Sequence, residues 1–177
     1  LAHVTCVSTD EEALDNYLAS LKSHGIQNIL ALRGDMPDGR EPKKVYTHAS
    51  DLAVAIKQKG DFCIGGACYP EGHPEAASVA ADIDALKIKA ESGCEFFTTQ
   101  MFFDNDIMYS FLSKFQRKGI NIPVIAGIMP ITNARQLGRS VALSGTTVPR
   151  RFREIVERFG DKPLAMRQAG IAFATEQ

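Results

Sequence analysis

The chain has 177 residues, 45% of them hydrophobic, and its 20 Lys and Arg residues almost balance its 21 Asp and Glu residues. This size and composition predict one globular domain over residues 1–177, and the balanced charge, without a basic stripe, excludes nucleic acid as an expected partner. Because no apolar run approaches the roughly 18 residues that a membrane span requires, we expect no membrane association and a cytoplasmic location.

Apolar runs alternate with helical patterns along the whole chain. The runs that predict strands are VTCV at 4–7, ILAL at 29–32, FCIGGAC at 62–68, EFFTTQM at 95–101 and IPVIAGI at 122–128. Apolar residues at helical spacing predict a helix after each strand, and two more helical stretches follow, around 152–159 and from about Pro163 to the end. Such alternation is typical of parallel strands joined by right-handed crossovers.

Local signals set the expected helix boundaries. A T-x-x-E capping box at 9–12 marks the start of the first helix, and the second helix is expected over 51–59. The third helix is expected to begin at Pro74, because proline is favoured in the first helical turn. Its apolar face is predicted to include Val79 and Ile83.

Two α/β architectures fit this pattern, an open doubly wound sheet and part of a (β/α)8 TIM barrel. The G-x-G-x-x-G fingerprint of a doubly wound dinucleotide fold does not occur between a strand and a helix. Polar or aromatic groups instead follow nearly every strand, where barrel enzymes build their active sites. We therefore predict a partial barrel of about five β/α units, whereas a complete barrel has eight.

The four cysteines are Cys6, Cys63, Cys68 and Cys94. They form no C-x-x-C pair, and the odd spacing of Cys63 and Cys68 within one strand places them on opposite faces. Buried free thiols are therefore expected, and no metal site is predicted. Zinc held by His3 with Cys6, or by His73 with Cys68, is the weaker alternative.

Five motifs carry a resemblance to a known family. They are HVTC at 3–6, ALRGD at 31–35, ACYPEGHPEA at 67–76, TTQMFFD at 98–104 and GIMPITN at 127–133. In this order and spacing they resemble methylenetetrahydrofolate reductase, a family of flavin-dependent (β/α)8 barrels, along nearly the whole chain. The family's barrel begins two strands before His3 and ends one strand after Gln177, so the resemblance implies the middle and later part of such a barrel.

The resemblance implies an FAD site. The residues that it assigns to the cofactor are His3, Arg33, Gly34, Asp35, Ala49, Ala67, Tyr69, His73, Asp82, Lys87 and Lys89. Tyr69 and His73 would pack on the dinucleotide, Asp82 would bind its sugar, and the two lysines would reach its phosphates. Gly65 and Gly66 would let a ring system approach the backbone. Without the resemblance, the YPEGHP turn is an ordinary strand exit and the charged residues after it are an ordinary solvated helix face.

The resemblance also assigns residues to the substrate. Asp35 matches a catalytic carboxylate beside the flavin and the pterin ring of the folate. Gln100 and Gln136 match glutamines that contact the folate, and Gln100 also matches a contact to the nicotinamide. The ordinary alternatives are that Asp35 caps a loop and that Gln100 satisfies backbone groups.

Three positions depart from the family pattern. Ala85 and Ile88 stand where some members have Asn and Arg, so fewer phosphate contacts are expected from this helix. Ser140 replaces a Phe that some members stack on their ligands, so that role does not carry over.

The implied reaction reduces 5,10-methylenetetrahydrofolate to 5-methyltetrahydrofolate, which supplies methionine synthesis, with FAD as cofactor and NADH or NADPH as hydride donor. In the family, a Glu on the first barrel strand supplies the proton, and neither Glu71 nor Glu75 matches it, so residues 1–177 alone are expected to be inactive. The alternatives are a flavin- or folate-binding barrel without hydride chemistry and a pterin-dependent methyltransferase barrel. The exposed strand edges of a partial barrel predict a homo-oligomer.

Overall fold

The structure of the protein, a computed structural model, describes residues 1–35 and 45–177. Its strands form one parallel sheet in the order β1 (Ala2–Thr5), β2 (Asn28–Leu32), β3 (Cys63–Cys68), β4 (Cys94–Thr99) and β5 (Val124–Ile125). A short 3-10 helix, Cys6–Ser8, follows β1. The α-helices are α1 (Glu11–Ser23), α2 (Ala49–Lys59), α3 (Val79–Glu91), α4 (Asn105–Arg117), α5 (Ala134–Ser144), α6 (Arg150–Phe159) and α7 (Pro163–Glu176).

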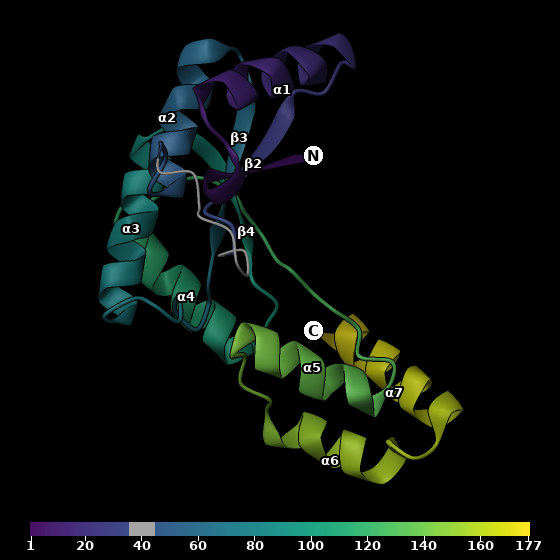
Figure 1. Cartoon of the computed structure of the whole chain (residues 1–177). Coiled ribbons are helices and arrows are strands. Elements are labelled where there is room, and N and C mark those ends of the chain that lie inside the picture. The colour runs from purple at the N-terminus through teal and green to yellow at the C-terminus, as the bar shows by residue number, and fades with distance from the viewer. Residues whose placement is uncertain (36–44) are drawn as a thin grey trace.

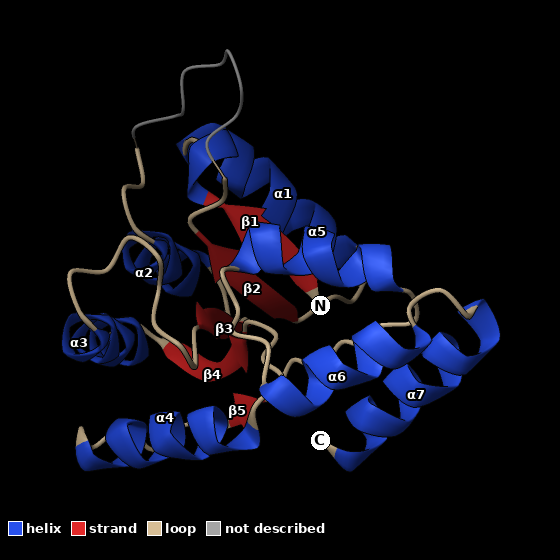
Figure 2. Ribbon diagram, turned by 90° about the horizontal axis from the view of Figure 1, so that it is seen from below, coloured by secondary structure: helices blue, strands red, loops and turns tan. Residues whose placement is uncertain are grey.

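Each strand pairs in parallel with the next strand in sequence, and helices α1 to α4 lie along one face of the sheet (Figures 1 and 2). A doubly wound sheet has a point at which the strand order reverses, and it has helices on both faces. Consecutive order with the helices outside is the arrangement of a (β/α)8 barrel. The predicted partial barrel of about five units is therefore confirmed.

The main core lies between the sheet and helices α1 to α4. Val4, Ala31 and Phe97 come from different strands, face these helices and are buried. Leu14 of α1 and Leu86 of α3 are fully buried against them from the helix side. The opposite face of the sheet, which would line the inside of a barrel, begins with the exposed His3 on β1.

Helices α5, α6 and α7 form a second lobe, seen beyond the sheet in Figure 1. Its buried residues are Phe103, Ile131, Phe152 and Met166. The ring of Phe152 stacks on that of Phe173 with centroids 4.3 Å apart, and its centroid lies 5.3 Å from that of Phe103. Because Phe103 follows β4, this second cluster is built onto the end of the sheet. None of the helices in the described residues combines the length and apolar character needed to cross a bilayer.

Three predicted helix starts are wrong. The second helix begins at Ala49 rather than at residue 51, because Asp51 Oδ2 accepts from His48 N at 2.9 Å and so caps a helix that starts earlier. The first helix is capped by Asp10, whose Oδ1 accepts from Ala13 N at 2.9 Å, because the 3-10 turn occupies the residues just before Thr9. The third helix begins at Val79 rather than Pro74, since the Ser78 hydroxyl accepts from the N–H of its first turn. Val79 is consequently at the exposed start of α3, 40% exposed, and not on its buried face.

The fifth strand is shorter than the expected 122–128. Pro123 has no N–H to donate to a ladder, and its carbonyl accepts from Phe97 N at 2.9 Å. After Ile125 the chain leaves the ladder, and Gly127 N donates instead to the side-chain hydroxyl of Thr99 at 2.8 Å. Only Val124 and Ile125 therefore pair with β4.

The cysteines are free, as predicted, and three of them, Cys6, Cys68 and Cys94, are buried, whereas Cys63 is partly buried. Burial raises the pKa of Cys68 to about 12 and the pKa of Cys6 and Cys94 to about 11, so these thiols stay protonated at neutral pH. Within residues 1–35 and 45–177, no group of three or more His, Cys, Asp or Glu side chains is placed to hold a metal ion.

Two helical glycines provide a matched test of the second lobe. A Cβ added to Gly138 of α5 meets no atom within 4 Å, whereas one added to Gly170 of α7 would overlap the carbonyl oxygen of Ile131. Gly138→Ala should raise the free energy of unfolding by about 1 kcal/mol through helix propensity. Gly170→Ala should lower it by about 1–3 kcal/mol through overpacking, although the propensity gain is the same. Urea unfolding of both variants would measure this, and a stabilised Gly170→Ala would contradict the close packing of α7.

Candidate functional site

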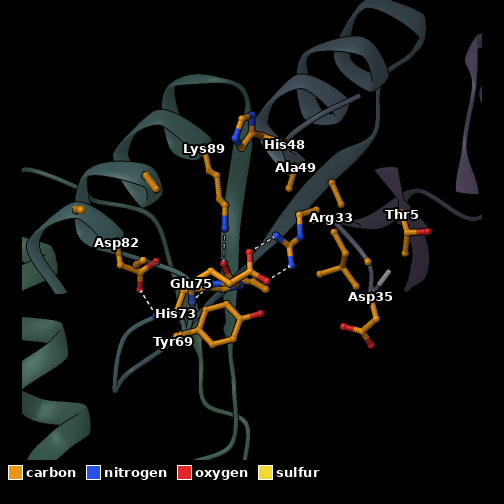
Figure 3. Close-up of a pocket in the computed structure, with 17 residues that line it drawn as sticks. Thr5, Arg33, Asp35, His48, Ala49, Tyr69, His73, Glu75, Asp82 and Lys89 are labelled. Carbon is orange, nitrogen blue, oxygen red and sulfur yellow. Dashed lines mark hydrogen bonds and ion pairs between the residues drawn. The ribbon is translucent and has the colours of Figure 1, made fainter. Parts of the chain in front are cut away.

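A cleft of about 560 Å³ lies at the carboxyl ends of β1, β2 and β3. Thr5 is the last residue of β1, Arg33 and Asp35 come after the end of β2, and Tyr69 directly follows β3. The start of α2 and one side of α3 close the remaining walls, as Figure 3 shows. Because parallel strands end at one edge of a sheet, groups far apart in the sequence meet here, and the volume falls within the range of about 300–1,000 Å³ found for small-molecule sites.

The segment 69–78 forms one wall of the cleft and is shaped by local hydrogen bonds. Gly72, at φ +91°, donates its N–H to Tyr69 O at 3.0 Å, which makes a tight turn. His73 N donates to Asp82 Oδ2 at 3.1 Å, and His73 Nδ1 accepts from Glu75 N at 3.1 Å. These bonds bring the rings of Tyr69 and His73 into an edge-to-face contact, with centroids 4.6 Å apart.

An ion pair spans the mouth of the cleft. Arg33 donates from Nη1 to Glu75 Oε2 at 2.5 Å and from Nη2 to Glu75 Oε1 at 2.8 Å, a two-pronged contact that Figure 3 shows above Tyr69. The hydrogen bond lowers the pKa of Glu75 and raises that of Arg33. Both side chains are well exposed, so this pair contributes little to stability and remains available for exchange with a ligand.

Helix α3 contributes two partly desolvated charges. Asp82 is 6% exposed, and burial raises its carboxyl pKa although the N–H of His73 and the charge of Lys89 act in the opposite direction. Burial likewise lowers the pKa of Lys89, whose Nζ donates to Ala67 O of β3 at 3.0 Å. Each group is therefore shifted toward its neutral form, as expected for charges held away from water.

The predicted cofactor residues fall into two sets. Those that line the cleft are Arg33, Gly34, Asp35, Ala49, Ala67, Tyr69, His73, Asp82 and Lys89. Among residues 1–35 and 45–177, His3 and Lys87 do not line it. On a helix, positions two residues apart differ by about 200°, so Lys87 points away from Lys89 and approaches Glu91 at 4.0 Å instead. His3 lies one inward-facing position before Thr5, farther from the rim.

The two predicted substrate glutamines also lie outside the described lining of the cleft. Gln100 follows β4, and its Oε1 accepts from Met101 N at 2.9 Å. Gln136 is in the first turn of α5, where its Oε1 accepts from Thr132 N at 3.0 Å. Both amides thus hold local backbone, and their contact with folate stays a prediction.

The expectation that a ligand ring lies against Gly65 and Gly66 is wrong. The ring of Phe96 lies over Gly65, and a Cβ added to Gly66 would be 2.9 Å from Cε1 of Phe97. The two glycines accommodate aromatic side chains of the neighbouring strand, so the protein itself fills the space beside them.

The cleft also contains residues that the sequence analysis did not assign. They are Thr5, Ala31, Leu32, His48, Glu75, Ala76, Ala81 and Ala85. Thr5 had a usable signal, since it is the last residue of its strand. His48 could also have been found from the sequence, because it directly precedes Ala49, which the resemblance assigns to the cofactor. The pairing of Glu75 with Arg33 had none, because it depends on the conformation of a loop.

Comparison with known proteins identifies the family of this chain. The model of the methylenetetrahydrofolate reductase family matches residues 1–177. The chain belongs to this family. Methylenetetrahydrofolate reductase (NADH) 1 of Arabidopsis thaliana is 36% identical over 99% of the chain and 32% of its own length. The 5,10-methylenetetrahydrofolate reductase of Escherichia coli is 32% identical over 98% of the chain and 58% of its own length. The chain thus spans 32% and 58% of the lengths of these two relatives.

A solved structure supports the fold. An uncharacterised protein from Clostridium thermocellum, described as binding two copies of 5-methyl-5,6,7,8-tetrahydrofolic acid, matches with a TM-score of 0.52 and 14% identity. The match covers 99% of this chain and 81% of that one. At this identity, the likeness concerns the barrel fold alone.

The departures from the methylenetetrahydrofolate reductase pattern lie at different places. Ala85 lines the cleft, so the Asn side chain that some members carry at this position is absent from the site itself. Ile88 is 55% exposed, and Ser140 is buried in α5. Only the change at position 85 therefore alters the described wall of the cleft.

The lowered pKa of Lys89 predicts a specific pH dependence. Folding favours its neutral amine, so its stabilising contribution is full above the ordinary pKa of 10.5 and is lost as the pH falls through the lowered folded value. The free energy of unfolding of the wild type, relative to Lys89→Met, should rise toward pH 10.5 by at most about 1.4 kcal/mol per pH unit. Urea unfolding across this range measures the difference, with Lys87→Met as the matched control. If the difference in free energy of unfolding between the wild type and Lys89→Met does not change with pH, the desolvation of Lys89 is contradicted.

Proposed function

We propose that this chain forms the cofactor-binding part of a flavin-dependent methylenetetrahydrofolate reductase, which reduces 5,10-methylenetetrahydrofolate to 5-methyltetrahydrofolate. The observation that carries the proposal is the cleft at the ends of β1 to β3, where Asp35, Tyr69, His73, Asp82 and Lys89 meet in a member of this family. Sites at this end of the strands are the rule for barrel enzymes.

The residues of the cleft fit FAD. The edge-to-face rings of Tyr69 and His73 offer apolar surface for a flat ring system, and the carboxylate of Asp82 offers an acceptor for sugar hydroxyls. In the part of the cleft that the structure describes, Lys89 and Arg33 are the lysine and arginine that can meet phosphate groups. With Ala85 beside them in place of a polar residue, few further phosphate contacts are available from α3.

Bound flavin supplies hydride transfer, from NADH or NADPH to the methylene group of the folate. The contribution of this chain is to bind and orient. Asp35 is exposed at the rim, where its carboxylate can accept hydrogen bonds from the pterin ring and place negative charge beside the flavin. Gln100 and Gln136 can exchange their local backbone contacts for amide contacts to folate, and Gln100 for one to the nicotinamide.

A second candidate is a flavin- or folate-binding barrel without hydride chemistry. The observation that favours it is that both cleft cations already have partners within the chain, Arg33 in Glu75 and Lys89 in the Ala67 carbonyl. A ligand with phosphates would have to exchange the Arg33–Glu75 pair and share the Lys89 ammonium with the Ala67 carbonyl, whereas a ligand without phosphates would leave both contacts in place.

We also propose a cytoplasmic homo-oligomer. β1 and β5 are the edges of the described sheet, and Leu1 and Ile125 beside them are 63% and 53% exposed. Light scattering after size-exclusion chromatography of residues 1–177, in which these edges are unpaired, should give a mass of at least two chains, and a monomer would overturn this assignment.

The affinity of the cleft for FAD should depend on the ring of Tyr69. Tyr69→Ala removes one ring of the aromatic pair and should raise the Kd for FAD roughly 10-fold, equivalent to about 1.4 kcal/mol. Titration of the intact apoprotein with FAD, followed by flavin absorption, measures this. Tyr109→Ala on α4, where the tyrosine is 64% exposed and outside the described cleft lining, is the matched control and should leave the Kd unchanged.

Anaerobic addition of NADH separates the two candidates. Bleaching of bound flavin, with reoxidation by methylenetetrahydrofolate, is expected of the reductase. Folate binding without flavin would instead favour the second candidate. Residues 1–177 alone are expected to give no turnover, because no residue among them matches the family's proton-donating Glu; steady NADH oxidation by this fragment would contradict that expectation.

A further inference from the structure

The segment between α5 and α6 contacts the cleft loop from outside the cleft. Both carboxylate oxygens of Glu71 accept from the backbone N–H of Thr147, at 2.9 and 3.1 Å. Glu71 lies in the loop that follows β3, and Thr147 lies between the end of α5 at Ser144 and the start of α6. This contact thus joins the loop of the first lobe to the helices of the second.

The segment that Glu71 contacts is itself fixed. Thr146 is 4% exposed, and its Oγ1 donates to the carbonyl of Met101, directly after β4 and Gln100, at 3.1 Å. Its N–H donates to Ser144 Oγ at 3.2 Å, which ties it to the end of α5. The backbone before Thr147 is therefore fixed, so the N–H of Thr147 can anchor a loop.

The position of Glu71 in the loop explains why its contact with Thr147 can affect the cleft. Glu71 lies inside the turn closed by the bond from Gly72 N to Tyr69 O, between the two residues whose rings face the cleft, Tyr69 and His73. His73 is held from α3 by Asp82, and Tyr69 follows directly on Cys68, whose carbonyl accepts from Gln100 N at the end of β3. Glu71 lies between these two ends and ties the middle of the turn to Thr147.

We propose that Glu71 is a positioning residue that holds the turn carrying Tyr69 and His73 in its binding conformation by anchoring it to Thr147. The proposal rests on the proposed flavin function of the cleft. A hydrogen bond to a carboxylate is stronger than one between neutral groups. A loop ordered before binding does not have to be ordered by the ligand, and affinity rises accordingly.

The test uses three variants of the intact protein. Glu71→Ala removes both acceptor oxygens, whereas Glu71→Gln keeps one acceptor and loses the charge. Glu91→Ala on α3 is the matched control, because that carboxylate is 66% exposed and approaches only Lys87 among the described ion pairs. The measurements are amide hydrogen exchange of residues 69–78 without ligand, the Kd for FAD, and the visible circular dichroism of bound flavin.

Glu71→Ala should speed exchange at the amides of Gly72 and His73, raise the Kd for FAD by ~10-fold and change the flavin dichroism. Glu71→Gln should restore part of each effect, and Glu91→Ala should change none of them. Unchanged exchange in Glu71→Ala, with the variant still folded, would overturn the contact. Faster exchange with an unaltered Kd and dichroism would overturn the positioning role.

The two proposals fail in different ways. If the wild type binds no FAD, the proposed function fails and the flavin role of Glu71 fails with it. The exchange rates of the unliganded protein would still decide whether Glu71 holds the loop. If the wild type binds FAD and all three variants bind it equally, the cleft function stands and the role of Glu71 alone is overturned.

Discussion

The pairing of β3 with β4 depends on Gly65 and Gly66 having no side chains. Phe96 lies over Gly65 and Phe97 packs against Gly66, so a Cβ at either glycine would press into a ring of the neighbouring strand. β3 is the middle strand of the sheet, and it ends at Cys68, directly before Tyr69. The same close packing that joins the two strands therefore determines where the cleft loop leaves the sheet.

The electrostatics of the cleft are largely balanced by the chain itself. Among the described lining residues, the cations Arg33 and Lys89 and the carboxylates of Asp35, Glu75 and Asp82 give a formal charge of −1 when all five are ionised. The exposed pair, Arg33 with Glu75, can exchange partners at little cost. Asp82 and Lys89 are shifted toward their neutral forms by burial, so a charged ligand close to them would restore part of the lost solvation. An anionic ligand is thus better accommodated at Lys89 than beside Asp35.

The order of strands, and the polar residues Arg33, Asp35 and Tyr69 that follow them into the cleft, could be predicted from periodicity, whereas Ala49, Ala67, Asp82 and Lys89 were assigned only through the family resemblance. Parallel strands with polar residues at their ends must collect those residues at one edge, whatever the details of the loops. Prediction from the sequence failed where two nearby residues both favour the start of a helix. Ser78 and Pro74 can each start a helix, and the outcome depends on a hydroxyl reaching a backbone N–H. The resemblance also does not take account of helical angle: Lys87 lies outside the described cleft lining and approaches Glu91 instead, so its phosphate contact stays a prediction. Glu75 and Glu71 act through loop geometry, which no local pattern contains.

The two hydrophobic clusters divide the predicted functions between them. The proposed cofactor residues that line the cleft are attached to the first cluster, through β1, β2, β3 and α3. Gln100 and Gln136 adjoin Met101 and Leu137, which pack against the second. For the proposed hydride transfer the flavin and the folate must touch, so in the proposed reductase the relative position of the two clusters would affect the rate. Contacts between the lobes, such as Glu71 with Thr147, then matter beyond stability, because they set where one set of residues lies with respect to the other.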